Sequence, residues 1–327
     1  MPIVKSDFSP SLAFKNKHFN SVYRVFFMKE KHSYERKRIT TFDDDFLDLD
    51  FSLVGSKTIA LLIHGLEGSS ESSYVLAAVS ELNKAGIDCV SLNLRGCSGE
   101  DNLLLKTYHS GKTEDVDFVI QHLLKNYNYE NIVIVGYSLG GNLTLKYMGE
   151  YSENISSKIK CAIAVSVPCD LTASGRKMST LINKPYMNRF LNTLRVKVEK
   201  KAKKFPEYAL DKDALKKAKN FKDFDTIYTA PVFGFKSPED YWRKASSKPF
   251  LKDITTPTLL ITSLDDPFLS KECFPYQEAE HNNSFFLEVT KYGGHVGFMS
   301  SFNHQKNRWL EHRMIHFVKQ NGIDTIS

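Results

Sequence analysis

Short apolar runs rich in strand-forming residues alternate with helix-like stretches through the first half of the chain. The strand-like runs lie at residues 37–41, 46–53, 58–63, 87–93, 132–135 and 162–167. Helix-like stretches lie at residues 73–84, 113–126 and 143–148. In the second of these, Thr113 is the expected N-cap. Strands that alternate with helices predict an α/β fold, with a mostly parallel central sheet flanked by helices.

The alternation stops between residues 171 and 251, where the chain is helical, aromatic and basic. It resumes with strand-like runs at residues 258–261 and 285–289, and a final helix is expected from about residue 305 to residue 319. We therefore predict three segments. The core comprises residues 1–170 and 252–327, and residues 171–251 form a helical cap or lid inserted between the sixth and seventh strands of the pattern.

The sharpest local signal is the stretch Gly136–Asn142, which reads Gly-Tyr-Ser-Leu-Gly-Gly-Asn. It lies directly between the apolar run 132–135 and a helical pattern. A G-x-S-x-G sequence at a strand-to-helix turn is the nucleophile elbow, which leaves the serine oxygen pointing away from the sheet edge. A dinucleotide-binding loop would require glycine where Ser138 stands. The turn is therefore predicted to carry a nucleophilic serine, with a purely structural turn as the alternative.

A serine hydroxyl needs a base to take its proton and a third group to orient that base. His295 is the predicted base, because it lies in the glycine-rich loop Gly293–Gly297 after the last strand-like run. The competing histidines lie in a polar loop or with the final helix and are expected on the surface or in packing. They are His281, His304, His312 and His316.

The acid should follow the preceding strand. Asp266 is the predicted acid, because it stands directly before the turn-forming Pro267 and can project from the strand end toward the base. Asp265 is the first alternative, with capping of its own turn as its structural role. Asp170, after the strand-like run 162–167, is the second alternative.

A tetrahedral intermediate also needs two backbone donors for its oxyanion. The amide of Leu139, the residue after the nucleophile, is one predicted donor. The other should come from the loop His64–Ser70, where Leu66 is the natural candidate. Alone, this loop would be read as a plain glycine turn.

Composition and charge narrow the function classes. The chain has 327 residues and a formal net charge of +6. No apolar run is long enough to cross a bilayer, and the first twenty residues lack the apolar core of a signal peptide, so a cytoplasmic location is expected. Five cysteines without a C-x-x-C pair favour neither disulfide bonds nor a zinc site. No metal or cofactor is expected.

Much of the positive charge lies in residues 195–204, where six lysines and arginines face a single glutamate. A basic amphipathic helix can attract anionic lipid head groups or acyl-CoA, which would bring peripheral membrane contact. A solvated face of the lid is the favoured interpretation. Nucleic-acid binding is not expected, because no nucleic-acid-binding module accompanies the charge.

Taken together, these motifs resemble the YheT-like branch of the α/β-hydrolases, which includes bacterial esterases, yeast ethanol acyltransferases and mammalian phospholipases and acylglycerol lipases. The matching segments are residues 64–70, 93–99, 108–111, 136–142, 265–268 and 293–298, with 224–225, 228–231, 234–235 and 241–247 inside the insertion. The resemblance runs from about residue 16 to the C-terminus, but residues 191–220 carry no family motif. It implies an ester-cleaving or acyl-transferring enzyme with Ser138, Asp266 and His295 as its triad.

The sequence thus predicts a cofactor-independent serine hydrolase that cleaves carboxylic esters of small molecules, with short or medium acyl chains. Ser138 attacks, His295 moves the proton, and Asp266 orients His295. Acyl transfer to an alcohol with the same triad is the nearest alternative. A non-catalytic ligand receptor and a peripheral lipid-binding protein on the same fold are the others.

Overall fold

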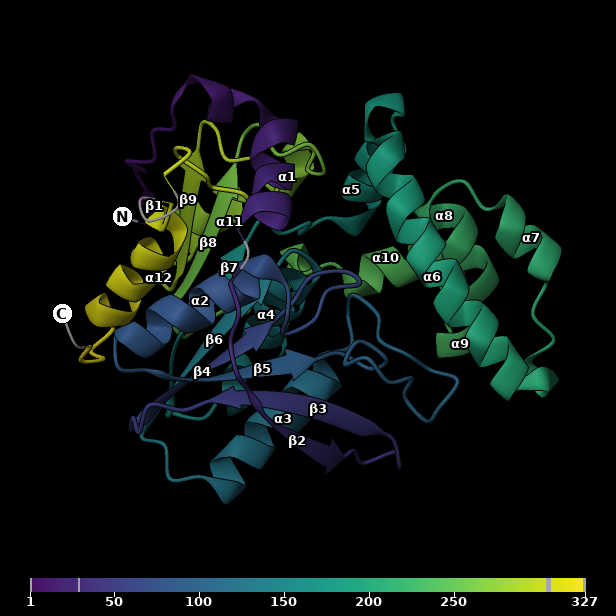
Figure 1. Cartoon of the computed structure of the whole chain (residues 1–327), viewed down its shortest axis with the longest axis horizontal. Coiled ribbons are helices and arrows are strands. Elements are labelled where there is room, and N and C mark those ends of the chain that lie inside the picture. The colour runs from purple at the N-terminus through teal and green to yellow at the C-terminus, as the bar shows by residue number, and fades with distance from the viewer. Residues whose placement is uncertain (1, 29, 304–306, 326–327) are drawn as a thin grey trace.

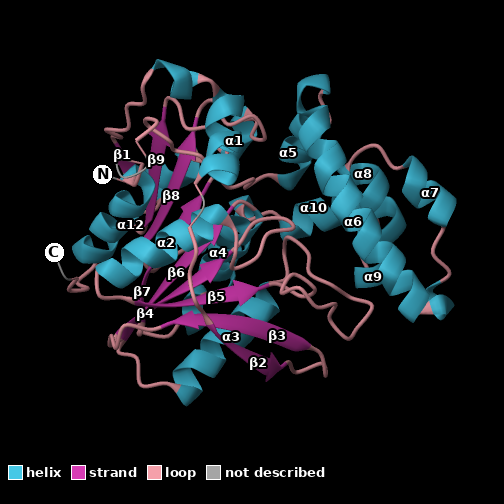
Figure 2. Cartoon of the chain, viewed as in Figure 1, coloured by secondary structure: helices cyan, strands magenta, loops and turns pink. Residues whose placement is uncertain are grey.

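The central feature of the fold is one large, mostly parallel sheet. The structure, a computed structural model, describes residues 2–28, 30–303 and 307–325. Within them, nine strands follow the order β1-β9-β8-β7-β6-β4-β5-β3-β2 (Figures 1 and 2). Only the pairs β2–β3 and β3–β5 are antiparallel. The strands are β1 Ile3–Val4, β2 Glu35–Thr40, β3 Phe46–Ser52, β4 Thr58–Ile63, β5 Asp88–Asn93, β6 Asn131–Tyr137, β7 Ile159–Val165, β8 Thr258–Ser263 and β9 Phe285–Thr290.

Helices cover both faces of the sheet and give it two separate apolar cores. Helices α2 (Ser73–Lys84) and α12 (Trp309–Gln320) pack on one face, and α3 (Thr113–Asn126) and α4 (Leu139–Glu150) pack on the other. Side chains alternate between the two faces along a strand. In β4, Ile59 and Leu61 enter one core while Ala60 and Leu62 enter the other. Because both faces are covered, the central strands are apolar throughout and not alternating.

Two N-terminal elements were absent from the sequence prediction. The short edge strand β1 pairs with β9. Because β1 comes before the six strands of the sequence pattern, the insertion predicted after the sixth strand lies between β7 and β8. Helix α1 (Lys17–Phe27) lies beside the loop after β9. The expected start of the final helix at Gln305 lies outside the described residues. Thr113 is the first residue of α3, with Lys112 at the N-cap, so the predicted capping by Thr113 is wrong.

The chain between β7 and β8 is helical and extends beyond one end of the sheet, where Figure 1 shows it in teal and green. Its helices are α5 (Leu171–Met178), α6 (Lys184–Lys204), α7 (Lys212–Lys217), α8 (Phe221–Phe224), α9 (Ala230–Phe233) and α10 (Pro238–Ala245). A π-helical turn, Asp225–Thr229, joins α8 to α9. Helices α5 to α9 share an apolar cluster that includes Met187, Leu191, Leu215 and Phe224 and reaches Phe268 of the core, whereas α10 belongs to a second cluster. We treat all of these helices as the proposed cap.

The two ends of the proposed cap lie together. The backbone N–H of Lys248 donates to the carbonyl of Cys169 at 3.1 Å, and the N–H of Leu171 donates to Ser246 Oγ at 3.0 Å. Asn142 of α4 also contacts the segment by which the chain leaves the proposed cap. Its side-chain amide donates to the carbonyl of Ala245 at 2.8 Å, and its side-chain oxygen accepts from the N–H of Ser247 at 2.9 Å. The cap therefore leaves and rejoins the core beside the first turn of α4.

In the part of the chain that the structure describes, no helix has the length and apolar character needed to cross a membrane.

Candidate active site

Ser138 lies on the sharp turn between β6 and α4, in a backbone conformation that few residues adopt. Its φ is 51° and its ψ is −113°. The flanking glycines make this turn possible. A Cβ at Gly136 would lie 2.3 Å from the carbonyl oxygen of Gly140, and a Cβ at Gly140 would lie 2.3 Å from that of Ile63. The turn thus has the close packing and backbone strain of a nucleophile elbow.

The three residues singled out in the sequence form one hydrogen-bonded chain. His295 Nε2 lies 2.9 Å from Ser138 Oγ, and His295 Nδ1 lies 2.8 Å from Asp266 Oδ2. Because a carboxylate only accepts, the Nδ1–H donates to Asp266, which leaves Nε2 free to accept the proton of Ser138. The Asp266 side chain is fully buried. The other oxygen of Asp266 accepts from the N–H of Phe268 at 2.8 Å, so the acid is held from both sides.

The two alternative acids have other partners. Asp265 Oδ1 accepts from the N–H of Gly294 at 2.9 Å, so it ties down the His295 loop and does not cap its own turn as expected. Asp170 is the N-cap of α5, where its side chain accepts from the N–H of Ala173 at 2.9 Å. Neither carboxyl is hydrogen-bonded to His295, whereas that of Asp266 is.

The loop after β4 carries Leu66, whose amide is the predicted oxyanion donor. The carbonyl of Gly65 accepts from His64 Nδ1 at 2.7 Å and from the N–H of Gly68 at 3.0 Å. In a trans peptide the N–H points opposite to the C=O. Because the Gly65 carbonyl points toward His64 Nδ1 and the N–H of Gly68, the Leu66 N–H points away from these two groups. Among the described residues, neither the Leu66 amide nor the Leu139 amide donates to another protein group.

His64 itself is structural. It is buried, and burial lowers its pKa to about 4, so the ring is neutral near pH 7. Its Nε2 accepts from the N–H of Leu94 at 3.1 Å, and this fixes the tautomer that donates from Nδ1 to Gly65. The sequence grouped His64 with the oxyanion loop without assigning it this role.

Helix α1 supports the His295 loop through polar side chains, which the sequence analysis missed. Ser21 Oγ accepts from the N–H of His295 at 2.8 Å. Asn20 Oδ1 accepts from the N–H of Met299 at 3.0 Å, and Arg24 donates to the carbonyl of Gly297 at 3.1 Å. Arg24 is buried and also forms an ion pair with Glu311 of α12. The loop that carries the candidate base is therefore anchored to an element outside the sheet.

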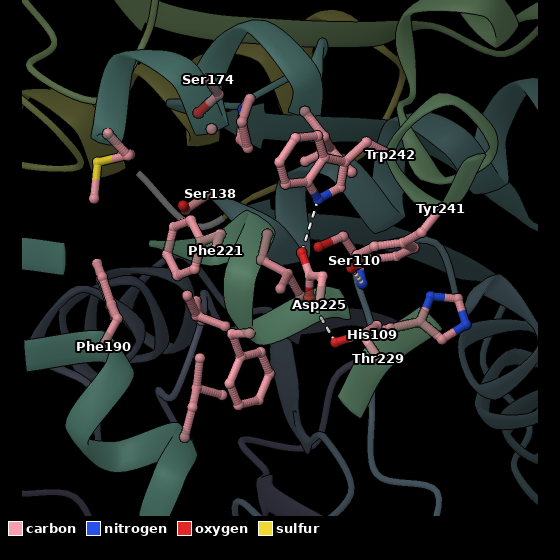
Figure 3. Close-up of a pocket in the computed structure, with 18 of the residues that line it drawn as sticks. His109, Ser110, Ser138, Ser174, Phe190, Phe221, Asp225, Thr229, Tyr241 and Trp242 are labelled. Carbon is pink, nitrogen blue, oxygen red and sulfur yellow. Dashed lines mark hydrogen bonds between the residues drawn. The ribbon is translucent and has the colours of Figure 1, made fainter. Parts of the chain in front are cut away.

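Two cavities meet at Ser138. The first, of about 140 Å³, is lined mainly by apolar side chains of the cap. Figure 3 shows several of them, including Phe190, Phe221 and Trp242. The second, of about 600 Å³, lies between α1, the loop 65–74 and α6, and it includes the charged side chains of Lys31, Glu71 and Arg189. Leu66, Ser138, Phe190, Phe268 and His295 line both cavities. An ester held at Ser138 would thus have two mainly apolar spaces beside it, of which the larger carries charged side chains of both signs.

Asp225 introduces a buried carboxyl into the wall of the first cavity. Its oxygens accept from Trp242 Nε1 at 2.8 Å and from Thr229 Oγ1 at 2.6 Å (Figure 3). Burial raises its pKa to about 7, although both hydrogen bonds favour the ionised form. Among the described residues, Asp225 forms no ion pair with a lysine or arginine. Residues 224–225 are among the segments that match the family in sequence, but the sequence pattern did not predict a buried carboxyl at Asp225.

His109 also lines the first cavity and is packed among aromatic rings. The rings of Phe233, Phe235 and Tyr241 lie 4.6, 5.4 and 5.6 Å from its own, centroid to centroid. Burial lowers its pKa to about 3, so it is neutral near pH 7. Ser138, in contrast, is hydrogen-bonded to His295, and the His109 ring packs against aromatic side chains of the proposed cap.

Known proteins with similar sequences cover nearly the whole chain. A sequence model of the alpha/beta hydrolase fold matches residues 60–302. "Putative esterase YheT" of Escherichia coli (strain K12) is 31% identical over 94% of this chain and 92% of its own length. The human protein "Phospholipase ABHD3" is 29% identical over 97% of this chain and 80% of its own length.

The fold is also shared with solved structures. The Pyrococcus furiosus esterase Pf2001 superposes with a TM-score of 0.59 over 88% of this chain and 91% of its own, at 20% identity. At this level of identity the likeness concerns the fold alone. The resemblance to the YheT-like branch is confirmed by the relatives, and the predicted fold class is confirmed by the family match and the sheet. The chain therefore belongs to the α/β-hydrolase fold family.

Proposed function

We propose that this protein cleaves carboxylic esters through an acyl-enzyme on Ser138, with His295 as base and Asp266 as the acid that orients it. As a member of this family with esterase, phospholipase and monoacylglycerol lipase relatives, it is a carboxylic ester hydrolase. The observation that carries the mechanism is the hydrogen-bonded chain from Asp266 through His295 to Ser138, at 2.8 and 2.9 Å, which ends where two cavities meet.

In the proposed reaction His295 Nε2 takes the proton of Ser138 as the oxygen attacks the ester carbonyl. The tetrahedral oxyanion lies against the amides of Leu66 and Leu139. His295 then gives its proton to the leaving alcohol, and the ester oxygen departs. Water then attacks the acyl carbonyl as His295 takes its proton, and His295 gives that proton to Ser138 Oγ as the bond between this oxygen and the acyl carbon breaks and the acid leaves. Asp266 stabilises the protonated imidazole in both halves of the cycle.

The two cavities suggest how the ester lies. The acyl chain fits the 140 Å³ cavity, because its walls are mainly apolar and aromatic. The alcohol portion fits the 600 Å³ cavity, because that space is larger and carries charged side chains of both signs. The small volume of the first cavity supports the expected preference for short or medium acyl chains.

The test is a series of p-nitrophenyl esters of increasing acyl length, with wild type and Ser138→Ala side by side. We expect wild-type turnover to peak at a short or medium chain and Ser138→Ala to lose several orders of magnitude in kcat. Labelling of wild type, but not of Ser138→Ala, by a fluorophosphonate would identify the nucleophile. Wild-type turnover rates in Ser138→Ala would refute the proposal. Ethyl esters formed when ethanol is added would identify acyl transfer as a second outcome of the same acyl-enzyme.

A further inference from the structure

The basic helix α6 turns two of its lysines into the protein. Of the six cations in residues 195–204, Lys200, Lys203 and Lys204 are exposed, as expected for a solvated face. Lys197 and Lys201 are not: the exposed fraction of the Lys197 side chain is 11%, and Lys201 is 1% exposed as a residue. The interpretation of this run as a solvated face is therefore wrong for these two positions.

The two inward lysines contact different parts of the core. Lys201 Nζ donates to the carbonyls of Asn102 and Leu104, both at 2.6 Å. Lys197 Nζ lies 2.7 Å from Glu67 Oε1 and 3.3 Å from Cys97 Sγ. Both lysines dock the cap helix on the core, but only Lys197 contacts the loop that carries Leu66.

Glu67 directly follows the proposed oxyanion donor Leu66, and its backbone is strained. Its φ is +54°, a conformation that non-glycine residues adopt only when their surroundings hold them there. Tyr108 supplies part of that hold. Its hydroxyl accepts from the N–H of Glu67 at 2.9 Å and donates to Glu67 Oε1 at 2.6 Å. Lys197 completes the arrangement, because it is the cation that pairs with the same carboxylate.

The charge of Lys197 matters as much as its position. Burial alone would lower its pKa, but the neighbouring Cys97 and Glu67 raise it above the ordinary value, so the ammonium group stays charged at neutral pH. Without it, the Glu67 carboxylate, which is only 10% exposed, would be an uncompensated negative charge one residue from a developing oxyanion. Removing one partner of a buried ion pair is far more disruptive than removing both.

We propose that Lys197 is a positioning residue that couples docking of the cap to formation of the oxyanion hole, by holding and neutralising Glu67 beside Leu66. With the cap docked, Lys197 and Tyr108 fix the Glu67 backbone and hence the Leu66 amide. With the cap displaced, the loop loses its cation and the hole loses its donor geometry. This inference rests on the proposed ester hydrolysis and adds a residue from the cap to it.

The main test compares Lys197→Met with Lys201→Met, a matched control on the same helix that removes the other cap-docking cation. With the best p-nitrophenyl ester, we expect Lys197→Met to lower kcat by about 10- to 100-fold with little change in KM. Lys201→Met should leave kcat unchanged, even if its melting temperature falls, because the apolar side of α6 still packs with Phe268 of the core and Lys197 still pairs with Glu67. Lys197→Arg keeps the charge and should restore most of the lost kcat.

A second measurement separates the oxyanion hole from general damage. A trifluoromethyl ketone forms a tetrahedral oxyanion on Ser138, whereas the corresponding methyl ketone fills the same space without forming a stable one. Lys197→Met should weaken binding of the trifluoromethyl ketone in proportion to the loss of kcat/KM and leave binding of the methyl ketone unchanged. Adding Glu67→Gln to Lys197→Met should recover part of the lost kcat, because the uncompensated charge is gone.

Unchanged kcat in a folded Lys197→Met protein would overturn the inference, as would an equal loss of kcat in Lys201→Met. If Lys197→Met fails to fold, the double variant with Glu67→Gln decides, because a double variant that folds with the wild-type kcat leaves no role for the coupling. A wild-type protein that turns over no ester and whose Ser138 resists the fluorophosphonate would instead refute the proposed function itself.

Discussion

At the scale of single residues, the candidate site is defined by which hydrogen-bond partner each polar group has. The sequence left three candidates for the acid, two after one strand and one after the strand before it. Asp266 bonds His295, Asp265 bonds the Gly294 amide and Asp170 caps a helix. Sequence spacing favoured Asp266 because of the following proline, but it gave no information on the partner of Asp265. That partner depends on how two loops from different strands meet, which a local pattern does not encode.

Replacing Asp266 by asparagine should remove most activity without unfolding the protein. The amide would donate to His295 Nδ1 and so leave the proton on Nε2, where it blocks transfer from Ser138. We expect kcat for p-nitrophenyl esters to fall by about 10⁴-fold. Asp265→Asn is the matched control and should lose much less, because Asp265 does not contact the imidazole. The reverse order of the two effects would assign the acid to Asp265.

Asp225 gives a pH-dependent stability with a definite sign. Its pKa is raised from 3.8 to about 7 in the folded protein. Between these values the folded state keeps a proton that the unfolded state loses, so this group makes the protein less stable as pH rises from about 4 to 7. Above pH 7 the cost is constant, on the order of 4 kcal/mol.

Asp225→Asn does not titrate and should therefore become more stable relative to wild type as pH rises through this window. Urea unfolding at pH 4.5, 5.5, 6.5 and 7.5 measures the difference. Asp213→Asn, an exposed position on the same cap, is the control and should show no such trend. A pH-independent difference between Asp225→Asn and wild type would mean that Asp225 is ionised throughout.

At the scale of secondary structure, the sequence pattern predicted the helices and strands accurately where the buried residues are apolar and recur at a regular spacing. Helices α2 and α3 have the expected ranges, and the bounds of the central strands differ from the expected ones by at most three residues, because their buried faces consist mainly of aliphatic side chains. Helix α1 was missed for the opposite reason. Much of its buried face is polar, including Asn20, Ser21 and Arg24, whereas its apolar residues Val25, Phe26 and Phe27 are exposed. Strand β1 has two residues, which is too short for a periodic signal.

The polar face of α1 yields a prediction at this scale. Ser21→Ala removes the acceptor for the His295 N–H and so leaves a loop amide without a partner, at a cost of about 1–3 kcal/mol in the stability of the loop. We expect kcat to fall several-fold with KM unchanged, because the base is less firmly placed. Ser179→Ala removes only a donation from Oγ to the Gly175 carbonyl, the counterpart of the Ser21 bond to the Lys17 carbonyl, and should leave kcat unaffected. Equal kinetics for the two variants would limit α1 to a packing role.

At the scale of the whole molecule, the core carries the candidate triad and the proposed cap lines most of the smaller cavity. The division was visible in the sequence as a break in the strand–helix alternation. The contacts across it were not, because Lys197 and Glu67 are 130 positions apart in the chain and neither belongs to a periodic pattern. The positive charge of residues 195–204 was expected on the surface, yet two of its carriers, Lys197 and Lys201, point into the protein.

The joined ends of the cap have an evolutionary consequence. Because Lys248 bonds Cys169 across the base of the insertion, a segment of another length can begin and end at the same two places, provided that it replaces the hydrogen bonds from Ser174 and Asn183 to the carbonyls of Phe268 and Pro267 beside Asp266. Exchange of this segment between related proteins can therefore change the preference for the ester. A transplanted segment would need to bring a cation for Glu67. Chimeras made at residues 170 and 246 would then inherit the acyl preference of the donor and the chemistry of the recipient.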